Sequence, residues 1–265
     1  METRKILLYW SLKFLGDWNQ IYEALAQKLE PDEEEAEELF KNVQSDYITF
    51  MDEEYPECLK RVFKPPFVLY YHGDISLISD NRNKLAVVGS RKCSTYGAKC
   101  TDDFVSELCK DFVIVSGLAY GIDATAHRAT IRNNGHTIAV LGNGINVCYV
   151  TDNKEIYDEC KKKHLLLSEY PNDTPPDPNY FPIRNRIIAG LCPTCLIPEG
   201  KIASGTQVTA FLMSRNNGNI CCIPTKIGEN SICNYLISQG AYLVETPDDV
   251  YEVARVVKKK PIFEN

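Results

Sequence analysis

The sequence of 265 residues contains no long hydrophobic run. A transmembrane helix needs about 18 or more consecutive apolar residues, and no segment approaches that length. The apolar stretch KILLYW (residues 5–10) is too short for a secretory signal peptide and lacks a small-residue cleavage site. We therefore predict a cytoplasmic protein without membrane contacts, large enough for one main hydrophobic core and a small appendage.

Cysteine is abundant, but the spacing of a metal site is lacking. Of the eleven cysteines, Cys192 and Cys195 form the one C-x-x-C pair, and Cys221 and Cys222 are adjacent. A structural zinc site needs four ligands at recognisable spacings, and cytoplasmic chains rarely use a disulfide framework. We predict that most thiols pack as small apolar side chains, with a metal site as the minor alternative, and we expect no cofactor.

An excess of positive charge is also lacking, since the formal net charge is −7. This value argues against a protein coated in basic surface for nucleic acid. The acids are unevenly placed, however, because EPDEEEAEE (residues 30–38) contains seven acids and no base. The rest of the chain has no net charge, so a local basic site remains compatible with the composition.

The pattern of apolar residues predicts an α/β fold, mainly a parallel sheet with helices on both faces. Residues 1–60 are typical of a small helical N-terminal region, and residues 61–265 of the main domain. Short apolar strands alternate with helices from Lys84 onward, as in βαβ units. The predicted strands are 67–71, 84–91, 112–117, 136–142, 164–171, 194–200, 219–224 and 241–245. The predicted helices of the main domain are 96–111, 121–135, 153–163, 180–191, 205–218, 230–240 and 247–260.

Ligands of such sheets bind at the carboxyl ends of the strands, so the turns there are the candidate site. The turns are 89–97, 116–123, 142–149, 168–171 and 199–206, and four of these five contain glycine. Glycine allows close approach of the backbone, and helix N-termini attract anions. With Arg91 in the first turn, and Arg184 and Arg186 on the nearby helix, these features predict a phosphate-binding crevice.

Two plainer interpretations stay open. Glycine and serine in βα turns can simply reverse the chain. Arg184 and Arg186 lie two residues apart, so on a helix they point to different sides. We therefore expect one arginine to be structural, paired with Glu169 or Glu199, and Asn185 to hold a neighbouring turn.

Signatures of catalysis are weak or missing. The sequence has no G-x-x-x-x-G-K-[ST] phosphate loop, and Gly142-Asn143-Gly144 lacks the third glycine of a dinucleotide fingerprint. Asp123 and His127 are four residues apart without an evident nucleophile, so a capping Asp and a core His are the favoured interpretation. Ser204 sits in no nucleophile elbow and suggests phosphate coordination or helix capping. We predict no catalytic residue.

The turns, in their order along the chain, resemble the DprA (Smf) family of DNA-processing proteins. The resemblance runs from about Tyr55 to Val250. Its motifs are YPECL, PPFVLYYHGD, VVGSR, SGLAYGIDATAH, TIAVLGNGIN, SEYP, FPIRNRIIAGL, SGTQVTA and NYLISQGA. It implies an extended Rossmann-like fold and a homodimer without established catalysis. The implied function is to bind and protect single-stranded DNA and to load the recombinase RecA during natural transformation.

The resemblance also implies a DNA-binding pocket. The family's pocket uses the Gly-Ser-Arg turn and a lysine that follows a Tyr-Pro pair after the third strand. The tyrosine is Tyr149 here, but Val150 and Thr151 replace the proline and lysine, and Lys154 is the candidate substitute. The predicted DNA-binding set is Gly89, Ser90, Arg91, Tyr149, Lys154, Arg184, Asn185, Arg186, Ser204, Gly205 and Thr206.

Two features differ from many members of that family. The chain ends at Asn265, so we expect no C-terminal winged-helix-like domain. The acidic residues 30–38 are unlike a DNA-contacting element.

A nucleotide-binding or nucleotide-hydrolysing enzyme resembling the LOG phosphoribohydrolases is the alternative. That family has a P-G-G-x-G-T-x-x-E turn in which the glutamate does the chemistry. Gly205 and Thr206 fit this turn, but Thr209 stands in place of the glutamate, and threonine is no general base at neutral pH. A non-catalytic nucleotide-sensing module would share the same crevice.

Overall fold

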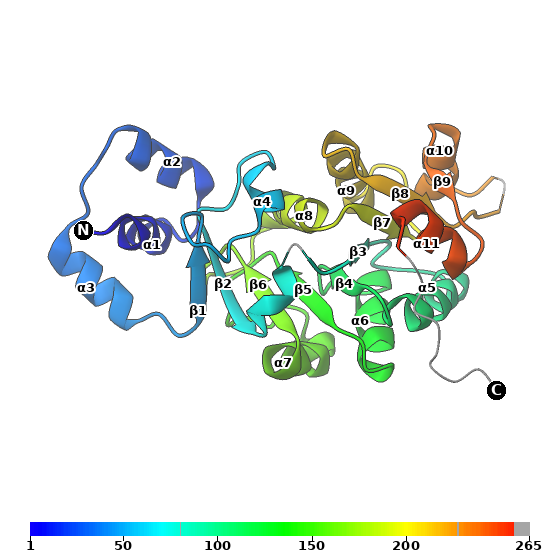
Figure 1. The fold of residues 1–265 in the computed structure, drawn as a ribbon, viewed down its shortest axis with the longest axis horizontal. Helices are drawn as coiled ribbons and strands as arrows, with labels where there is room; N and C mark the ends of the chain where they lie inside the picture. The colour runs from blue at the N-terminus through cyan, green and yellow to red at the C-terminus, as the bar shows by residue number, and fades with distance from the viewer. Residues whose placement is uncertain (80, 227, 257–265) are drawn as a thin grey trace.

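The computed structural model describes residues 1–79, 81–226 and 228–256. One nine-stranded sheet runs through the centre of the molecule, and helices cover both of its faces (Figure 1). Its strands are β1 (Asp46–Thr49), β2 (Val68–Gly73), β3 (Lys84–Val87), β4 (Val113–Ser116), β5 (Thr137–Leu141), β6 (Leu165–Ser168), β7 (Thr194–Ile197), β8 (Asn219–Cys222) and β9 (Tyr242–Leu243).

The strand order is β1-β2-β6-β5-β4-β3-β7-β8-β9. Pairing is parallel from β6 to β9, and β2 is antiparallel to both β1 and β6. Strands β3 to β7 are buried along their whole length, because helices cover both faces of a parallel sheet. The predicted fold class, α/β with a mainly parallel sheet and a helical N-terminal region, is confirmed.

The helices fall on two sides of the sheet (Figure 1). Helices α5 (Thr95–Leu108), α6 (Ile122–Arg132) and α7 (Lys154–Lys163) follow β3, β4 and β5 and cover one face. Helices α4 (Glu57–Lys60), α8 (Tyr180–Leu191) and α9 (Gly205–Arg215) cover the other. The remaining helical elements of the main domain are η1 (Ile75–Ile78), η2 (Thr151–Asn153), α10 (Ile232–Ser238) and α11 (Pro247–Ala254).

Helix α11 ends earlier than its apolar pattern predicts. It begins with a capping box, in which the Thr246 side chain and Asp249 satisfy each other's backbone N–H groups. It ends at Ala254, where Arg255 adopts a left-handed conformation. The last four residues of the predicted helix, 257–260, lie outside the described part of the chain.

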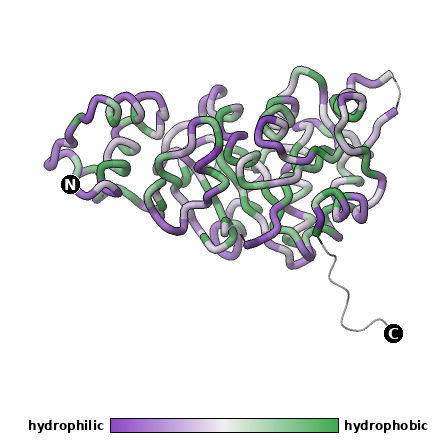
Figure 2. Tube along the Cα trace, turned by 45° about the horizontal axis from the view of Figure 1, so that its top comes forward, coloured by the Kyte–Doolittle hydropathy of each residue, from purple (hydrophilic) through white to green (hydrophobic). Residues whose placement is uncertain are grey.

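The N-terminal region packs three helices, α1 (Thr3–Lys13), α2 (Trp18–Ala26) and α3 (Glu33–Lys41), at one end of the molecule (Figure 1). Asp17 and Asp32 cap α2 and α3 by accepting a backbone N–H. The acidic run forms much of α3, and Figure 2 shows hydrophilic outer turns around an apolar interior. The expectation that residues 1–60 are all helical is wrong at β1, a four-residue edge strand too short to show clear periodicity.

The cysteines lie mostly inside the core. All eleven are in the described part of the chain; seven are buried, and Cys58, Cys93, Cys100 and Cys148 are half-buried. Within residues 1–79, 81–226 and 228–256, no group of three or more His, Cys, Asp or Glu residues could hold a metal ion. Across the same residues, no helix combines the length and apolar character needed to cross a membrane.

In the parallel part of the sheet, successive strands are added on opposite sides of one boundary. Strands β3, β4, β5 and β6 follow one another outward on one side, and the chain then returns to place β7, β8 and β9 on the other side of β3. The boundary between β3 and β7 is therefore the topological switch point. Loops diverge from the carboxyl ends of these two strands, and doubly wound folds bind ligands there.

Candidate functional site

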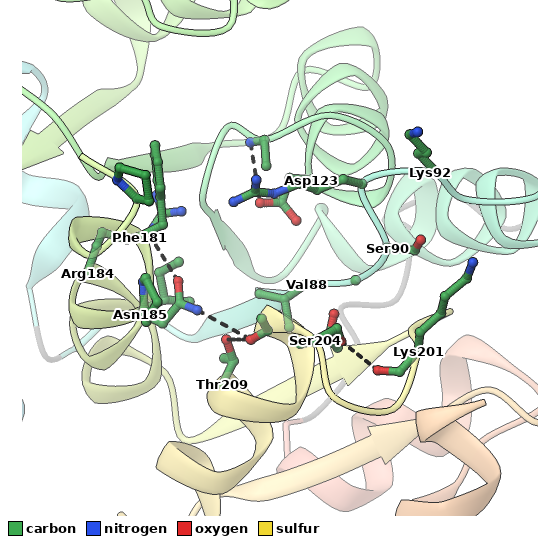
Figure 3. Close-up of a pocket in the computed structure, with 18 of the residues that line it drawn as sticks. Val88, Ser90, Lys92, Asp123, Phe181, Arg184, Asn185, Lys201, Ser204 and Thr209 are labelled. Atoms are coloured by element: carbon green, nitrogen blue, oxygen red, sulfur yellow. Dashed lines mark hydrogen bonds between the residues drawn. The ribbon is translucent and has the colours of Figure 1, made fainter. Parts of the chain in front are cut away.

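A crevice of about 620 Å³ opens at this switch point, above the carboxyl ends of β3 and β7. Its walls are the turns after β3, β4, β5 and β7 and the first turns of α8 and α9 (Figure 3). Nine of the eleven residues predicted for DNA binding line it: Gly89, Ser90, Arg91, Tyr149, Arg184, Asn185, Ser204, Gly205 and Thr206. Lys154 and Arg186 do not.

The Gly-Ser-Arg turn requires glycine at its first position. A Cβ on Gly89 would lie 2.5 Å from the carbonyl oxygen of Glu199 and 2.6 Å from the side chain of Ile122. The Ser90 N–H donates to the same Glu199 carbonyl at 2.9 Å, and the Ser90 carbonyl accepts the Ile122 N–H at 3.2 Å. The turn is thereby bound to the β7 turn and to the start of α6, which fixes the position of Arg91.

The Glu199 side chain also contacts the segment that follows this turn. Its carboxylate accepts the Ser94 N–H at 3.0 and 3.1 Å and the Ser94 hydroxyl at 2.5 Å. The bonds join the β7 turn to the N-terminus of α5. The expectation that Glu169 or Glu199 pairs with an arginine is therefore met by Glu169 alone, as described below.

Three exposed cations stand around the opening: Arg91, Lys92 and Lys201. None of them forms an ion pair within the described residues. Lys92 and Lys201 lie on the same side of the crevice, across from Phe181 and Asn185 (Figure 3). Both lysines lie in turns that the sequence indicated as candidate site, but they were missed because an exposed lysine has no distinguishing pattern.

Aromatic rings form the opposite wall. Tyr149 and Phe181 have ring centroids 5.5 Å apart, and the Arg91 guanidinium carbon lies 5.4 Å from the Phe181 ring centroid. Tyr149 is more than half exposed, so its ring is available to a ligand. Rings beside unpaired cations are the combination that single-stranded nucleic acids use, with bases on the rings and phosphates on the cations.

Arg184 lies at the base of the crevice and is buried. Its guanidinium donates to the Gly117 carbonyl at 2.9 Å, to the Val140 carbonyl, and to Asn185 Oδ1 at 3.1 Å. Burial lowers its pKa to about 10, partly offset by Asp123, so the arginine remains charged at neutral pH. Its charge therefore acts from beneath the crevice while its donors hold the ends of β4 and β5.

Asp123 is the counter-charge to Arg184. Its carboxylate is buried and accepts the N–H groups of Gly117 at 3.1 Å and Ala119 at 3.4 Å. Burial raises its pKa, and Arg184 and these backbone bonds oppose that rise. Asp123 therefore orders the turn after β4.

Arg186 does not border the crevice, contrary to the prediction. It points to the other side of α8, where one guanidinium nitrogen donates to both Glu169 oxygens at 2.6 and 2.8 Å. Its Nε donates to the Lys64 carbonyl at 2.8 Å. Both members of the pair are buried. The alternative that one arginine is structural and pairs with Glu169 is confirmed.

The prediction that Lys154 belongs to the DNA-binding crevice is also wrong. It is the first residue of α7 and forms an ion pair with Asp158, one turn later, at 2.7 Å. Its side chain is directed along the helix by this pair and lies outside the crevice lining. The lysine missing at Thr151 is therefore not replaced within the crevice by Lys154.

The start of α9 presents backbone donors to the crevice. The first N–H groups of a helix have no internal partners. Ser204 could cap them, but its hydroxyl instead donates to the Lys201 carbonyl at 2.6 Å. Asn185 donates to the Gly205 carbonyl at 3.4 Å, so it does hold this neighbouring turn. The helix start remains open to an anion such as a phosphate.

The residues considered for catalysis have structural partners. His127 Nδ1 and the Thr137 hydroxyl lie 2.7 Å apart in the core. Thr209 lines the crevice, but its hydroxyl donates to the Gly205 carbonyl at 3.3 Å. The Asp123 carboxylate accepts backbone N–H groups, and the Ser204 hydroxyl donates to a backbone carbonyl.

Proteins of known family are similar to this chain in sequence. The family model for DNA recombination-mediator protein A matches residues 46–255. DNA processing protein DprA of Streptococcus pneumoniae (strain R6) is 41% identical over 204 residues, covering 76% of this chain and 72% of that protein. The Bacillus subtilis (strain 168) protein of the same name is 36% identical over 208 residues, covering 77% of this chain and 70% of that one.

Solved structures agree with these sequences. The X-ray structure of S. pneumoniae DprA matches with a TM-score of 0.82 at 32% identity, covering 95% of this chain and 98% of that chain. DNA processing protein A of Helicobacter pylori, whose structure concerns its single-stranded DNA binding mode, matches with a TM-score of 0.72 at 28% identity, covering 79% and 95%. The resemblance drawn from the sequence motifs is confirmed, and the chain belongs to the DNA recombination-mediator protein A family.

Proposed function

We propose that this chain is a recombination mediator without catalytic activity, and that it binds single-stranded DNA in the crevice. The observation that carries the proposal is a set of three cations, Arg91, Lys92 and Lys201, around an open helix N-terminus and two aromatic rings. Among the described residues, these cations form no ion pair. The H. pylori relative binds single-stranded DNA. The crevice offers the same kinds of contact.

The contacts favour one strand over two. Cations and helix N–H groups bind phosphates whatever the sequence, and exposed rings need unpaired bases. A duplex hides its base faces and is too wide for turns this short. Binding is therefore expected to be nearly independent of sequence, sensitive to salt, and stronger for single strands.

A titration of labelled oligo-dT by fluorescence anisotropy at two salt concentrations tests the proposal. Arg91→Ala should weaken binding by roughly 1–3 kcal/mol, as loss of a charge-assisted contact would. Lys154→Ala removes an exposed cation outside the crevice and serves as the matched control. Equal affinity for duplex and single strand, or normal binding by Arg91→Ala, would contradict the proposal.

The crevice also bears on the alternative function, a nucleotide-hydrolysing enzyme. Thr209 replaces the glutamate of the phosphoribohydrolase turn, and its hydroxyl is directed to a backbone carbonyl. Incubation with nucleoside monophosphates should release no free base. Release of base that Thr209→Ala abolishes would favour the enzyme instead.

The family resemblance supports three further parts of the proposal. We propose RecA as the protein partner, a homodimer as the working state, and the cytoplasm as the location. Light scattering during gel filtration tests the dimer. Displacement of a single-strand binding protein by RecA, with and without this chain, tests loading.

A further inference from the structure

A second cavity lies on the other side of α8 from the crevice. It has a volume of about 360 Å³ and is lined mainly by apolar and aromatic side chains from α2, α8, α9 and the loop before β2. We call it the aromatic groove and define it by Trp18, Phe63, Tyr180, Ile183, Val208 and Phe211. Pro182 lines both this groove and the crevice, so the two adjoin at the first turn of α8.

Several large apolar side chains of the groove are exposed to solvent. Phe63 is 63% exposed and Phe211 is 60% exposed, and Ile183 and Val208 are also exposed. Soluble proteins seldom expose adjoining large apolar side chains without a ligand for them. The walls are also fixed, because Trp18 Nε1 donates to the Pro65 carbonyl at 2.8 Å and its ring stacks on Phe67 at 5.3 Å.

Two cations, Arg215 and Lys64, lie beside the rings of the groove. The Arg215 guanidinium lies 5.7 Å from the Phe211 ring centroid and 5.9 Å from that of Phe63. Lys64 Nζ lies 5.0 Å from the Trp18 ring and 2.5 Å from Asn19 Oδ1. In the described part of the chain, neither cation has an acidic partner at ion-pair distance.

The two acids that line the groove are already engaged. Glu169 holds Arg186, and Asp17 caps α2 by accepting the Gln20 N–H at 3.0 Å. The groove thus combines rings and apolar walls with positive charge beside the rings. This arrangement complements a ligand with flat apolar faces joined by an anionic backbone.

We propose that the aromatic groove holds bases of the same DNA single strand as it leaves the crevice over Pro182. The inference rests on the proposed function and deepens it, because it assigns a second segment of the DNA path. The bases stack on Phe63 and Phe211, and Arg215 and Lys64 contact the phosphates between them. Arg186 is then a positioning residue of this path, since it fixes the Lys64 backbone and Glu169 at the groove wall.

Oligonucleotide length separates the two segments. A short oligo-dT of about 4 nucleotides should occupy the crevice alone, and one of about 15 should reach the groove. Phe211→Ala should weaken binding of the long oligonucleotide by about tenfold and leave the short one unchanged. Arg91→Ala should weaken both. If wild-type protein binds neither, the proposed function fails; if Phe211→Ala leaves the long one unchanged, only the groove is overturned.

A second set of variants separates base stacking from the docking of an apolar peptide. Phe211→Leu keeps apolar bulk but removes the ring, so it should lose affinity for the long oligonucleotide nearly as Phe211→Ala does. Retained affinity in Phe211→Leu would overturn stacking. Phe63→Ala, on a separate segment, should repeat the loss and guards against a folding defect of α9.

A control and a spectroscopic readout complete the test. Tyr235→Ala removes a comparably exposed ring on α10, outside both cavities, and should change nothing. A 2-aminopurine placed toward one end of the long oligonucleotide should be quenched on binding to wild-type protein and not to Phe211→Ala. Equal quenching by both proteins would overturn the assignment.

Discussion

Arg184 and Arg186 stand two residues apart on α8 and reach opposite sides of the helix. The first donates to the carbonyl groups at the ends of β4 and β5, and the second pairs with Glu169. Both are buried, so the stretch YFPIRNRIIAGL is not a charged surface but a helix held from two sides. The crevice and the aromatic groove share this helix as a wall.

Removal of one member of the buried pair should destabilise the fold. Glu169→Gln leaves Arg186 buried without a counter-charge, which costs about 3–5 kcal/mol in comparable sites. We expect the free energy of unfolding, measured in denaturant at neutral pH, to fall by that amount. Glu159→Gln, which breaks the exposed pair with Lys163, should leave the midpoint unchanged. A midpoint that does not move in Glu169→Gln would show that water reaches the pair.

The crevice lysines should contribute to binding through their charge. Lys201→Ala and Lys92→Ala should each weaken single-strand binding for all sequences alike, and each should reduce the salt slope by about one. The reason is that each unpaired ammonium group releases one counterion from the DNA. Lys154→Ala should alter neither quantity, because Asp158 already neutralises that lysine. An unchanged slope for both crevice lysines would place the DNA elsewhere.

A lysine restored at Thr151 should strengthen binding. Thr151 is exposed at the start of η2, two residues after Tyr149 of the crevice. Thr151→Lys should tighten single-strand binding by up to about 1–2 kcal/mol at low salt and increase the salt slope by about one. Anisotropy titrations at several salt concentrations give both values. If neither changes, the turn after β5 is outside the DNA path.

Stability should fall in mild acid because of a buried histidine. The Thr137 hydroxyl donates its one hydrogen to the Ile114 carbonyl at 2.7 Å, so His127 Nδ1 must be the donor to Thr137. Nε2 is then unprotonated and buried, with no hydrogen-bond partner in the part of the chain that the structure describes, and a proton there would add an unpaired charge to the core. Burial accordingly lowers the pKa of His127 to about 3.

The sign of the pH effect follows from that shift. The folded pKa lies below the unfolded value of about 6.5, so the unfolded chain binds the proton first as pH falls. Stability is complete above pH 6.5 and is lost toward pH 3, by about 2 kcal/mol between pH 7 and pH 5. Burial also lowers the pKa of His164, which adds to the loss. Denaturant unfolding at both pH values checks this, and His127→Gln should flatten the dependence.

The sequence predicted the fold well because its determinants are local. Alternating apolar strands and helices imply right-handed crossovers, and this rule leaves few arrangements. The edge strand β1 was missed because its pairing with β2 is a tertiary contact of only four residues. The turns of the crevice were predicted for a similar reason, since the carboxyl ends of parallel strands must meet at one edge.

Side-chain partners were harder to predict. The pattern showed that Arg184 and Arg186 diverge, but not which of them faced Glu169, seventeen residues before Arg186. Lys154 lies near the position of the missing lysine in the sequence, but Asp158 holds its side chain along α7. Lys92 and Lys201 belong to one site only because the fold brings the turns after β3 and β7 together, and the sequence does not show that contact.

The distribution of thiols determines how the protein can be labelled for such measurements. Seven of the eleven cysteines are buried, and desolvation raises the pKa of several of them, so alkylating reagents should leave these untouched in the folded state. Cys93 follows Lys92, and Cys148 precedes Tyr149. Each of these two half-buried thiols is next in sequence to a residue of the crevice. With the other half-buried cysteines, Cys58 and Cys100, replaced by serine, a dye attached at Cys93 or Cys148 should report occupancy of the crevice.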